Sequence, residues 1–122
     1  MTSVLLVEDN VTLLESLQTF FRDNGFETHT AGSNQEAWQI IRETHPTVCV
    51  LDVNLPDGSG LDLFKRISVH YPTMRVIIMT ALPLENLRRQ YARPNLAGWL
   101  TKPVSPEQLL EAVERAASAE LH

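Results

Sequence analysis

Four strand-like stretches of this chain end in polar groups that could act together. The most informative is residues 47–51, an apolar and largely β-branched run that leads into Asp52 and then into a loop rich in proline and glycine. Such a run is typical of a strand buried on both faces, and open α/β folds place their chemistry at the carboxyl edge of such strands. The other three stretches end at Glu8 and Asp9, at Thr80 and at Lys102. The sequence therefore predicts one site that combines carboxylates, a hydroxyl and an ammonium group.

The chemistry of this site follows from charge. Two adjacent carboxylates, Glu8 and Asp9, would repel a third at Asp52 unless a cation lay among them. Because the cluster offers only oxygen ligands, with no convergent His or Cys, Mg²⁺ is the metal that fits best. A divalent cation, the ammonium of Lys102 and the hydroxyl of Thr80 would together stabilise an acyl phosphate on Asp52. The alternative is that the acidic pair caps the first helix and that Lys102 only pairs with Asp52.

The elements that must position these groups alternate between strand and helix five times. Strands are predicted at residues 4–7, 26–30, 47–51, 74–79 and 97–101. The first predicted helix ends at Asn24-Gly25, and the second opens with the capping box at residues 33–36. The third covers residues 61–69, and a short fourth helix lies between Pro83 and Pro94. The fifth is capped by Ser105 and has Pro106 at its first position. Repeated strand–helix units with short connections predict an α/β fold with a parallel sheet covered on both faces.

The composition of the chain argues against several classes of protein and function. With 122 residues and 43% apolar residues, the chain is expected to form one domain over residues 1–122. Its only cysteine, Cys49, lies inside an apolar strand, so we expect a buried structural thiol in a reducing cytoplasm. We expect no signal peptide and no membrane segment, because no apolar stretch approaches the roughly 18 residues that a membrane helix needs. The net charge of −5 argues against direct nucleic acid binding by this segment.

Four motifs together resemble the receiver domain of two-component response regulators, over residues 4 to about 117. They are Leu-Leu-Val-Glu-Asp-Asn at residues 5–10, Leu-Asp-Val-Asn-Leu-Pro-Asp-Gly-Ser-Gly at residues 51–60, Ile-Met-Thr-Ala at residues 78–81 and Leu-Thr-Lys-Pro at residues 100–103. The resemblance implies a flavodoxin-like (βα)5 three-layer sandwich whose five parallel strands lie in the order 2-1-3-4-5. It also implies a signalling switch, not a metabolic enzyme, that catalyses only its own phosphorylation and dephosphorylation.

The resemblance assigns roles to individual residues. A sensor histidine kinase or phosphotransfer protein would pass a phosphoryl group to Asp52. Mg²⁺ would be held by Asp9, Asp52 and the backbone carbonyl of Asn54, with Glu8 acting largely through water. Further assignments are Thr80 and Lys102 as phosphoryl contacts, a cis peptide bond before Pro103, Thr80 and Trp99 as switch residues, and an output domain or downstream protein as the recipient of the signal. Phosphorylation-dependent dimerisation is a further expectation.

Three departures from the family pattern fall on the output side of the predicted fold. Trp99 stands where a Tyr or Phe usually acts as the aromatic switch, and its larger ring with an N–H donor changes the fit of an inward position. Residues 91–98 replace a run that is commonly rich in Gly and Ala, and Val104 stands where Phe often follows the Lys-Pro pair. We therefore expect intact phosphorylation chemistry and an unusual readout surface.

Two other functions compete with this interpretation. The first is an aspartyl-phosphate phosphatase of the haloacid dehalogenase type, which places a second Asp two residues after its nucleophile; that position is Asn54 here, and no cap insertion is present. The second is a binding module that keeps the fold and works without phosphorylation. Loss of the acidic pair, of Asp52 or of Lys102 would favour such a module, and all of them are present.

Overall fold

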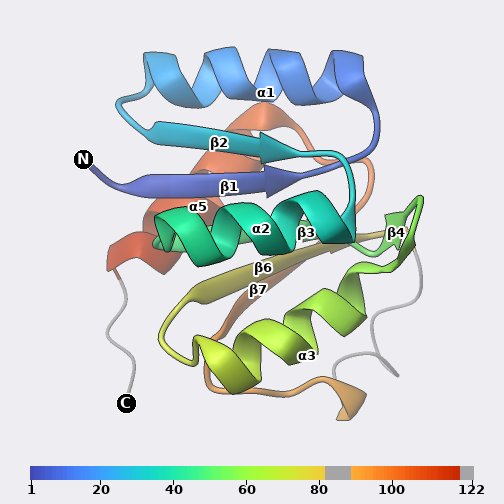
Figure 1. Cartoon of the computed structure of the whole chain (residues 1–122). Helices are drawn as coiled ribbons and strands as arrows, with labels where there is room; N and C mark the ends of the chain where they lie inside the picture. Colours follow the sequence, from blue (N-terminus) through green and yellow to red (C-terminus); the bar gives the residue numbers. More distant parts are fainter. Residues whose placement is uncertain (82–88, 119–122) are drawn as a thin grey trace.

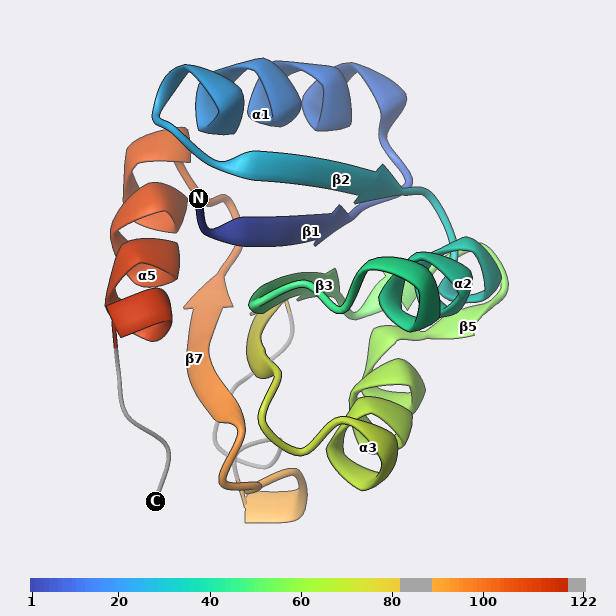
Figure 2. The same cartoon turned by 60° about the vertical axis from the view of Figure 1, so that its left-hand side comes forward.

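A computed structural model of the chain places one parallel sheet between two layers of helices (Figures 1 and 2). The structure describes residues 1–81 and 89–118. Within these residues no helix is long and apolar enough to cross a membrane.

Five parallel strands make up the sheet, in the order β2-β1-β3-β6-β7. Their bounds are β1 (Ser3–Val7), β2 (Glu27–Ala31), β3 (Val48–Asp52), β6 (Arg75–Thr80) and β7 (Leu96–Thr101). The two short strands β4 (Asn54–Leu55) and β5 (Gly58–Ser59) pair with each other as a separate antiparallel hairpin. The five sheet strands, taken in chain order, therefore lie as 2-1-3-4-5, while the hairpin was not predicted.

Within the described residues, two helices cover each face of the sheet. Helices α1 (Val11–Asp23) and α5 (Pro106–Ser118) share one face, and α2 (Asn34–Thr44) and α3 (Gly60–His70) share the other (Figure 2). The part of the chain that is described thus contains four of the five predicted helices. The remaining one, predicted between Pro83 and Pro94, falls largely on residues 82–88, outside the described residues.

The core consists of two apolar clusters separated by the sheet. One lies under α2 and α3 and includes Ile41 and Phe64, and the other lies under α1 and α5 and includes Phe21 and Val113. Strand β3 runs between them with all five of its residues buried, as expected for a central parallel strand. Cys49 is one of these residues, and burial raises the pKa of its thiol, which agrees with the predicted structural role.

Polar side chains begin the helices at the positions where the chain leaves the sheet. Asn10 accepts a hydrogen bond from the backbone N–H of Leu13 at 3.0 Å and thereby caps α1. Ser33 and Ser59 cap α2 and α3 in the same way. At α5 the predicted Ser105 cap is present and forms a reciprocal capping box, because Ser105 Oγ accepts from Gln108 N at 3.1 Å and Gln108 Oε1 accepts from Ser105 N at 3.0 Å.

Two strand boundaries differ from the prediction in ways that matter for the site. Strand β3 includes Asp52 as its last residue, so this carboxylate is held by the sheet and not by the following loop. Strand β7 begins at Leu96, and its pairing with β6 shifts by one residue, with Ile77 opposite Gly98 and Val76 opposite Leu96. Ala97 is therefore the extra residue of a bulge, which interrupts the regular alternation of the strand.

Candidate functional site

The predicted polar groups all lie at the carboxyl edge of the sheet. Asp52 and Thr80 end β3 and β6, while Glu8 and Lys102 directly follow β1 and β7. Backbone hydrogen bonds fix this edge: Glu8 N donates to Ala31 O at 3.0 Å, and Lys102 N donates to Thr80 O at 2.8 Å. Asp52, Thr80 and Glu8 are buried, at 2%, 1% and 4% exposure. The sheet thus holds the groups in a fixed arrangement.

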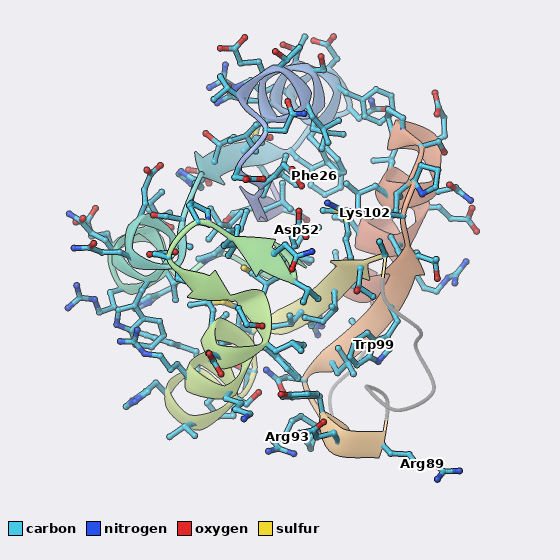
Figure 3. The ribbon with its side chains drawn as sticks, turned by 90° about the vertical axis from the view of Figure 1, so that its right-hand side faces the viewer. Phe26, Asp52, Arg89, Arg93, Trp99 and Lys102 are labelled. Carbon is cyan, nitrogen blue, oxygen red and sulfur yellow. The ribbon has the colours of Figure 1, made fainter. Side chains whose placement is uncertain are left out.

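Lys102 reaches into the acidic end of the site. Its Nζ lies 2.5 Å from Asp52 Oδ2 and 3.4 Å from Glu8 Oε2. Figure 3 shows the Asp52 and Lys102 side chains next to each other at this edge. Lys102 therefore bridges two carboxylates that come from different strands, and the pairing with Asp52 considered in the alternative interpretation is present.

Asp9 completes a group of three carboxylates. One oxygen from each of Glu8, Asp9 and Asp52 lies within 4.8 Å of the others, with Asp9 exposed and the other two buried. Glu8 and Asp9 do not cap α1, because Asn10 does so, and this half of the alternative interpretation is wrong. Instead Glu8 Oε1 accepts a hydrogen bond from Asn10 N at 3.3 Å, which keeps the glutamate turned toward the site.

The electrostatics of this group favour an added cation. Burial, followed by the hydrogen bond and the negative charge of Asp52, raises the pKa of Glu8 to about 7, although Lys102 acts in the opposite direction. Burial lowers the pKa of Lys102, but Asp52 and Glu8 outweigh this effect, and its pKa is raised overall. A divalent cation among these carboxylates would favour the ionised form of Glu8, and with all three carboxylates ionised (−3) and the Lys102 ammonium charged (+1) it would balance the net charge of −2. The oxygen-only ligand set is the one that Mg²⁺ prefers.

The loop after β3 approaches Asp52 closely. Asn54 N donates to Asp52 Oδ1 at 3.1 Å, and Gly60 N donates to Val53 O at 2.8 Å. A β-carbon on Gly60 would lie only 2.0 Å from the backbone oxygen of Asp52, so this position has no room for a side chain. The glycine thus lets the start of α3 pack against the end of β3.

The predicted switch and turn residues lie beside this group. The peptide bond between Lys102 and Pro103 is cis, the isomer that the resemblance implied. Trp99 lies on β7 opposite Ile78, half-buried against the apolar cluster under α2 and α3. Figure 3 shows it apart from Asp52, so the structure does not bring Trp99 into the acidic site.

An apolar groove of about 520 Å³ adjoins the site. It extends from Lys102 and Pro103 between α1 and the start of α5 and is lined by Glu8, Leu13, Leu17, Met79, Ala81, Lys102, Pro103, Val104 and Leu109. At its α1 border Leu13 is 38% exposed, and nearby on the same helix Val11 is 65% exposed. A surface of this composition beside a polar site is suited to contact with another protein.

Sequence reasoning did not identify the contribution of Asp57. Its carboxylate accepts hydrogen bonds from the backbone N–H groups of Asn34 and Gln35, more than twenty positions earlier in the chain. An Asp between Pro and Gly is an ordinary turn residue, and its sequence neighbours give no sign of this long-range contact.

Comparison with known proteins agrees with the geometry. Residues 4–114 match the family described as the response regulator receiver domain. The chain is 31% identical over 106 residues to the alginate biosynthesis transcriptional regulatory protein AlgB of Pseudomonas putida; the match covers 87% of this chain and 24% of AlgB, so the chain spans about a quarter of that relative. It is 28% identical over 117 residues to the polar-differentiation response regulator DivK of Brucella ovis, covering 92% of this chain and 93% of DivK.

Among solved structures, a CheY-like response regulator receiver domain protein from Methanospirillum hungatei JF-1 is similar, with a TM-score of 0.86 and 25% identity. The match covers 96% of this chain and 94% of that one. The flavodoxin-like arrangement of the sheet and its helices is therefore the receiver fold.

Proposed function

Because the chain belongs to the response regulator receiver family, we propose that it is a switch that is set by phosphorylation of Asp52. The observation that carries this proposal is the placement of the Asp52 carboxylate at the end of the central strand, buried between Lys102 and the acidic pair. Among the described carboxylates only Glu8 shares this burial and the contact with Lys102, and its oxygen lies farther from Nζ, at 3.4 Å against 2.5 Å for Asp52.

The proposed reaction is a transfer between two proteins. A carboxylate oxygen of Asp52 attacks the phosphorus of a phosphohistidine on a sensor kinase or phosphotransfer protein. The new O–P bond forms as the P–N bond breaks, and the electron pair of that bond returns to the imidazole nitrogen of the donor. Lys102, which contacts Asp52, and Thr80, which ends the adjacent strand, would then bind the phosphoryl oxygens.

Magnesium is the cofactor that we propose for this reaction. Asp9, Asp52 and the backbone carbonyl of Asn54 would hold it, with Glu8 acting through water. When bound, Mg²⁺ supplies positive charge that stabilises the phosphoryl oxygens. Glu8 lies on the buried side of the site, where its carboxylate keeps the ammonium of Lys102 between itself and Asp52.

The donor protein would dock beside the acceptor. The apolar groove next to Lys102 and the exposed Val11 and Leu13 on α1 offer an apolar surface at the entrance to the site. A partner that covers this surface would exclude water from Asp52 during transfer. We propose that the signal then passes to a C-terminal output domain or to a separate downstream protein, that phosphorylation can promote dimerisation, and that the protein works in the cytoplasm.

Phosphorylation by a small donor tests this proposal. Wild type and Asp52→Asn are incubated with acetyl phosphate and Mg²⁺ and analysed by intact-protein mass spectrometry. Wild type should gain one phosphoryl group that is stable in acid and labile in base, and a chelator should prevent the gain. Asp52→Asn should gain none, while its circular dichroism shows that it is folded. Equal labelling of the two proteins would refute Asp52 as the acceptor.

A further inference from the structure

Asp57 joins two segments that are distant in the chain. It lies in the turn of the β4–β5 hairpin, and its two carboxylate oxygens accept hydrogen bonds from Asn34 N at 2.8 Å and from Gln35 N at 3.0 Å. These are the first two N–H groups of α2, which have no partner within the helix. A carboxylate at a helix N-terminus is also favoured by the helix dipole. Asp57 therefore fixes the hairpin turn to the beginning of α2.

A second contact runs in the opposite direction. Asn34 Nδ2 donates to the backbone oxygen of Ser59 at 3.1 Å, so α2 also holds the second strand of the hairpin. Gly58 lies between these contacts with φ of +139°, and a β-carbon there would come within 3.3 Å of Asn34 Nδ2. The missing side chain lets the hairpin and the helix approach each other this closely.

The β4–β5 hairpin connects the start of α2 to the acidic site. Ser59 pairs with Asn54 across the two strands, and Leu55, next to Asn54, is buried in the core. Asn54 N in turn donates to Asp52 Oδ1 at 3.1 Å. The backbone of Asn54 thus lies between the acceptor carboxylate on one side and a strand held by α2 on the other.

From these contacts we propose that Asp57, together with Asn34, is a positioning residue for the metal site. It holds the hairpin so that the Asn54 carbonyl is pre-organised as a magnesium ligand beside Asp52. The proposal rests on the proposed function, because it assumes that Mg²⁺ binds among Asp9, Asp52 and Asn54. It adds to that function a role for the first turn of α2, which would hold the metal ligands in place through the hairpin.

The charge state of Asp57 agrees with this role. The N–H groups of Asn34 and then Gln35 lower the pKa of its carboxyl group, although the side chain is open to solvent. It is therefore a carboxylate at neutral pH, and a charge-assisted bond to two N–H groups is stronger and better oriented than a neutral one.

The chain offers a matched control for a purely structural role. Ser33 also caps α2, accepting from Glu36 N at 3.1 Å, but no described contact joins its side chain to the hairpin. Ser33→Ala and Asp57→Ala should both weaken the helix cap, whereas only Asp57→Ala should release the hairpin. Comparing the two separates loss of stability from loss of positioning.

The test measures Mg²⁺ binding to the unphosphorylated protein by isothermal titration calorimetry. Asp57→Ala and Asn34→Ala should each raise the Mg²⁺ dissociation constant, by about tenfold for Asp57→Ala, which is the lower end of the loss expected for an outer partner of a metal ligand. Asp57→Asn should recover part of the affinity, since its amide oxygen can accept one of the two bonds. Ser33→Ala should bind Mg²⁺ as wild type does.

The outcomes distinguish this inference from the proposed function. If wild type binds Mg²⁺ and Asp57→Ala binds it equally well, or if Ser33→Ala loses as much affinity as Asp57→Ala, the positioning role is refuted while phosphorylation of Asp52 stands. If wild type itself binds no Mg²⁺, the proposed metal site fails instead. Denaturant unfolding of each variant verifies that the proteins compared are folded at the temperature of the titration.

Discussion

At the scale of single residues, the site is held by one ammonium group between two carboxylates. Lys102 is the only base with a described ion pair to Asp52 or Glu8 within residues 1–81 and 89–118, and both carboxylates are buried. Lys102→Ala would leave the buried Asp52 carboxylate without its ammonium partner and would raise the pKa of Glu8 further, because Lys102 is one of the groups that lower it. We expect the variant to fold, with a free energy of unfolding lower by about 2 kcal/mol at neutral pH.

A double-mutant cycle tests the electrostatic cause of that loss. Asp52→Asn removes the carboxylate that Lys102 contacts most closely, so adding Lys102→Ala to it should cost less than the same change in wild type. The measurement is urea unfolding of the four proteins without Mg²⁺. If Lys102→Ala costs the same in both backgrounds, the stabilisation comes from packing of the lysine stem and not from its charge.

Asp57 gives a pH dependence with a definite sign. Its pKa in the folded protein lies below the ordinary value of 3.8, because the N–H groups at the start of α2 stabilise the carboxylate. The contribution of the Asp57 hydrogen bonds to the free energy of unfolding should therefore be fully present above the pKa that Asp57 has in the unfolded chain. It should be lost as the pH falls through the lower pKa that Asp57 has in the folded protein.

Urea unfolding from pH 7 to pH 3 measures this effect. The difference in unfolding free energy between wild type and Asp57→Asn should be constant near neutrality and shrink below about pH 4. Ser33→Ala serves as the control, because it removes a neutral hydroxyl cap from the same helix and its effect should not follow the titration of Asp57. A difference that grew as the solution became acidic would contradict the assigned bonds.

At the scale of elements, the junction between β3 and α3 depends on a glycine. A side chain on Gly60 would meet the backbone of Asp52, so Gly60→Ala should move either α3 or the end of β3. We expect a loss of about 1–3 kcal/mol, as for other overpacked sites, together with slower phosphorylation of Asp52. Gly32→Ala is the matched control, because the nearest atom to its β-carbon would be Glu8 O at 3.9 Å. Thermal unfolding and labelling rates of both variants check the expectation, which fails if Gly60→Ala behaves like Gly32→Ala.

Comparison of the observed elements with the sequence shows which of their features could be predicted. Capping motifs act through neighbouring residues, so the Ser33 and Ser105 caps were visible in the sequence and are confirmed. The convergence of Asp52 and Lys102 followed from strand polarity, because the carboxyl ends of parallel strands share one edge. The hairpin after β3 could not be predicted, since two strands of two residues each carry no periodicity. The contact of Asp57 with α2 depends on tertiary packing and leaves no local pattern.

At the scale of the whole molecule, the acidic site and Trp99 are separated along β7. The indole is half-buried against the cluster under α2 and α3, in a position that already contacts apolar groups. Burying it further would require a partner for its N–H. We therefore predict that Trp99 moves little when Asp52 is phosphorylated, and that the readout depends more on Thr80 and the segment that follows it.

Fluorescence can follow the indole directly. Trp38→Phe leaves Trp99 as the only tryptophan, since the chain contains two. Addition of beryllofluoride with Mg²⁺, as a phosphoryl mimic, should change its emission and its access to quencher only slightly. Trp99→Phe, which reports on Trp38 stacked against Arg66, controls for changes elsewhere. A large spectral shift with a change in quenching would show that the ring does swing.

The buried thiol of Cys49 on β3 can be used to detect rare events in which the core around the central strand opens. Cys49 lies three positions before Asp52, buried in the apolar cluster under α2 and α3 and with a raised thiol pKa, so a thiol reagent can reach it only when this part of the core opens. In the regime where reclosing is faster than modification, the labelling rate measures the population of opened molecules. A ligand that binds only the closed form should slow that rate by the factor 1 + [Mg²⁺]/Kd. The labelling rate of this native thiol would thus measure how strongly Mg²⁺ at the acidic site stabilises the closed form of the protein.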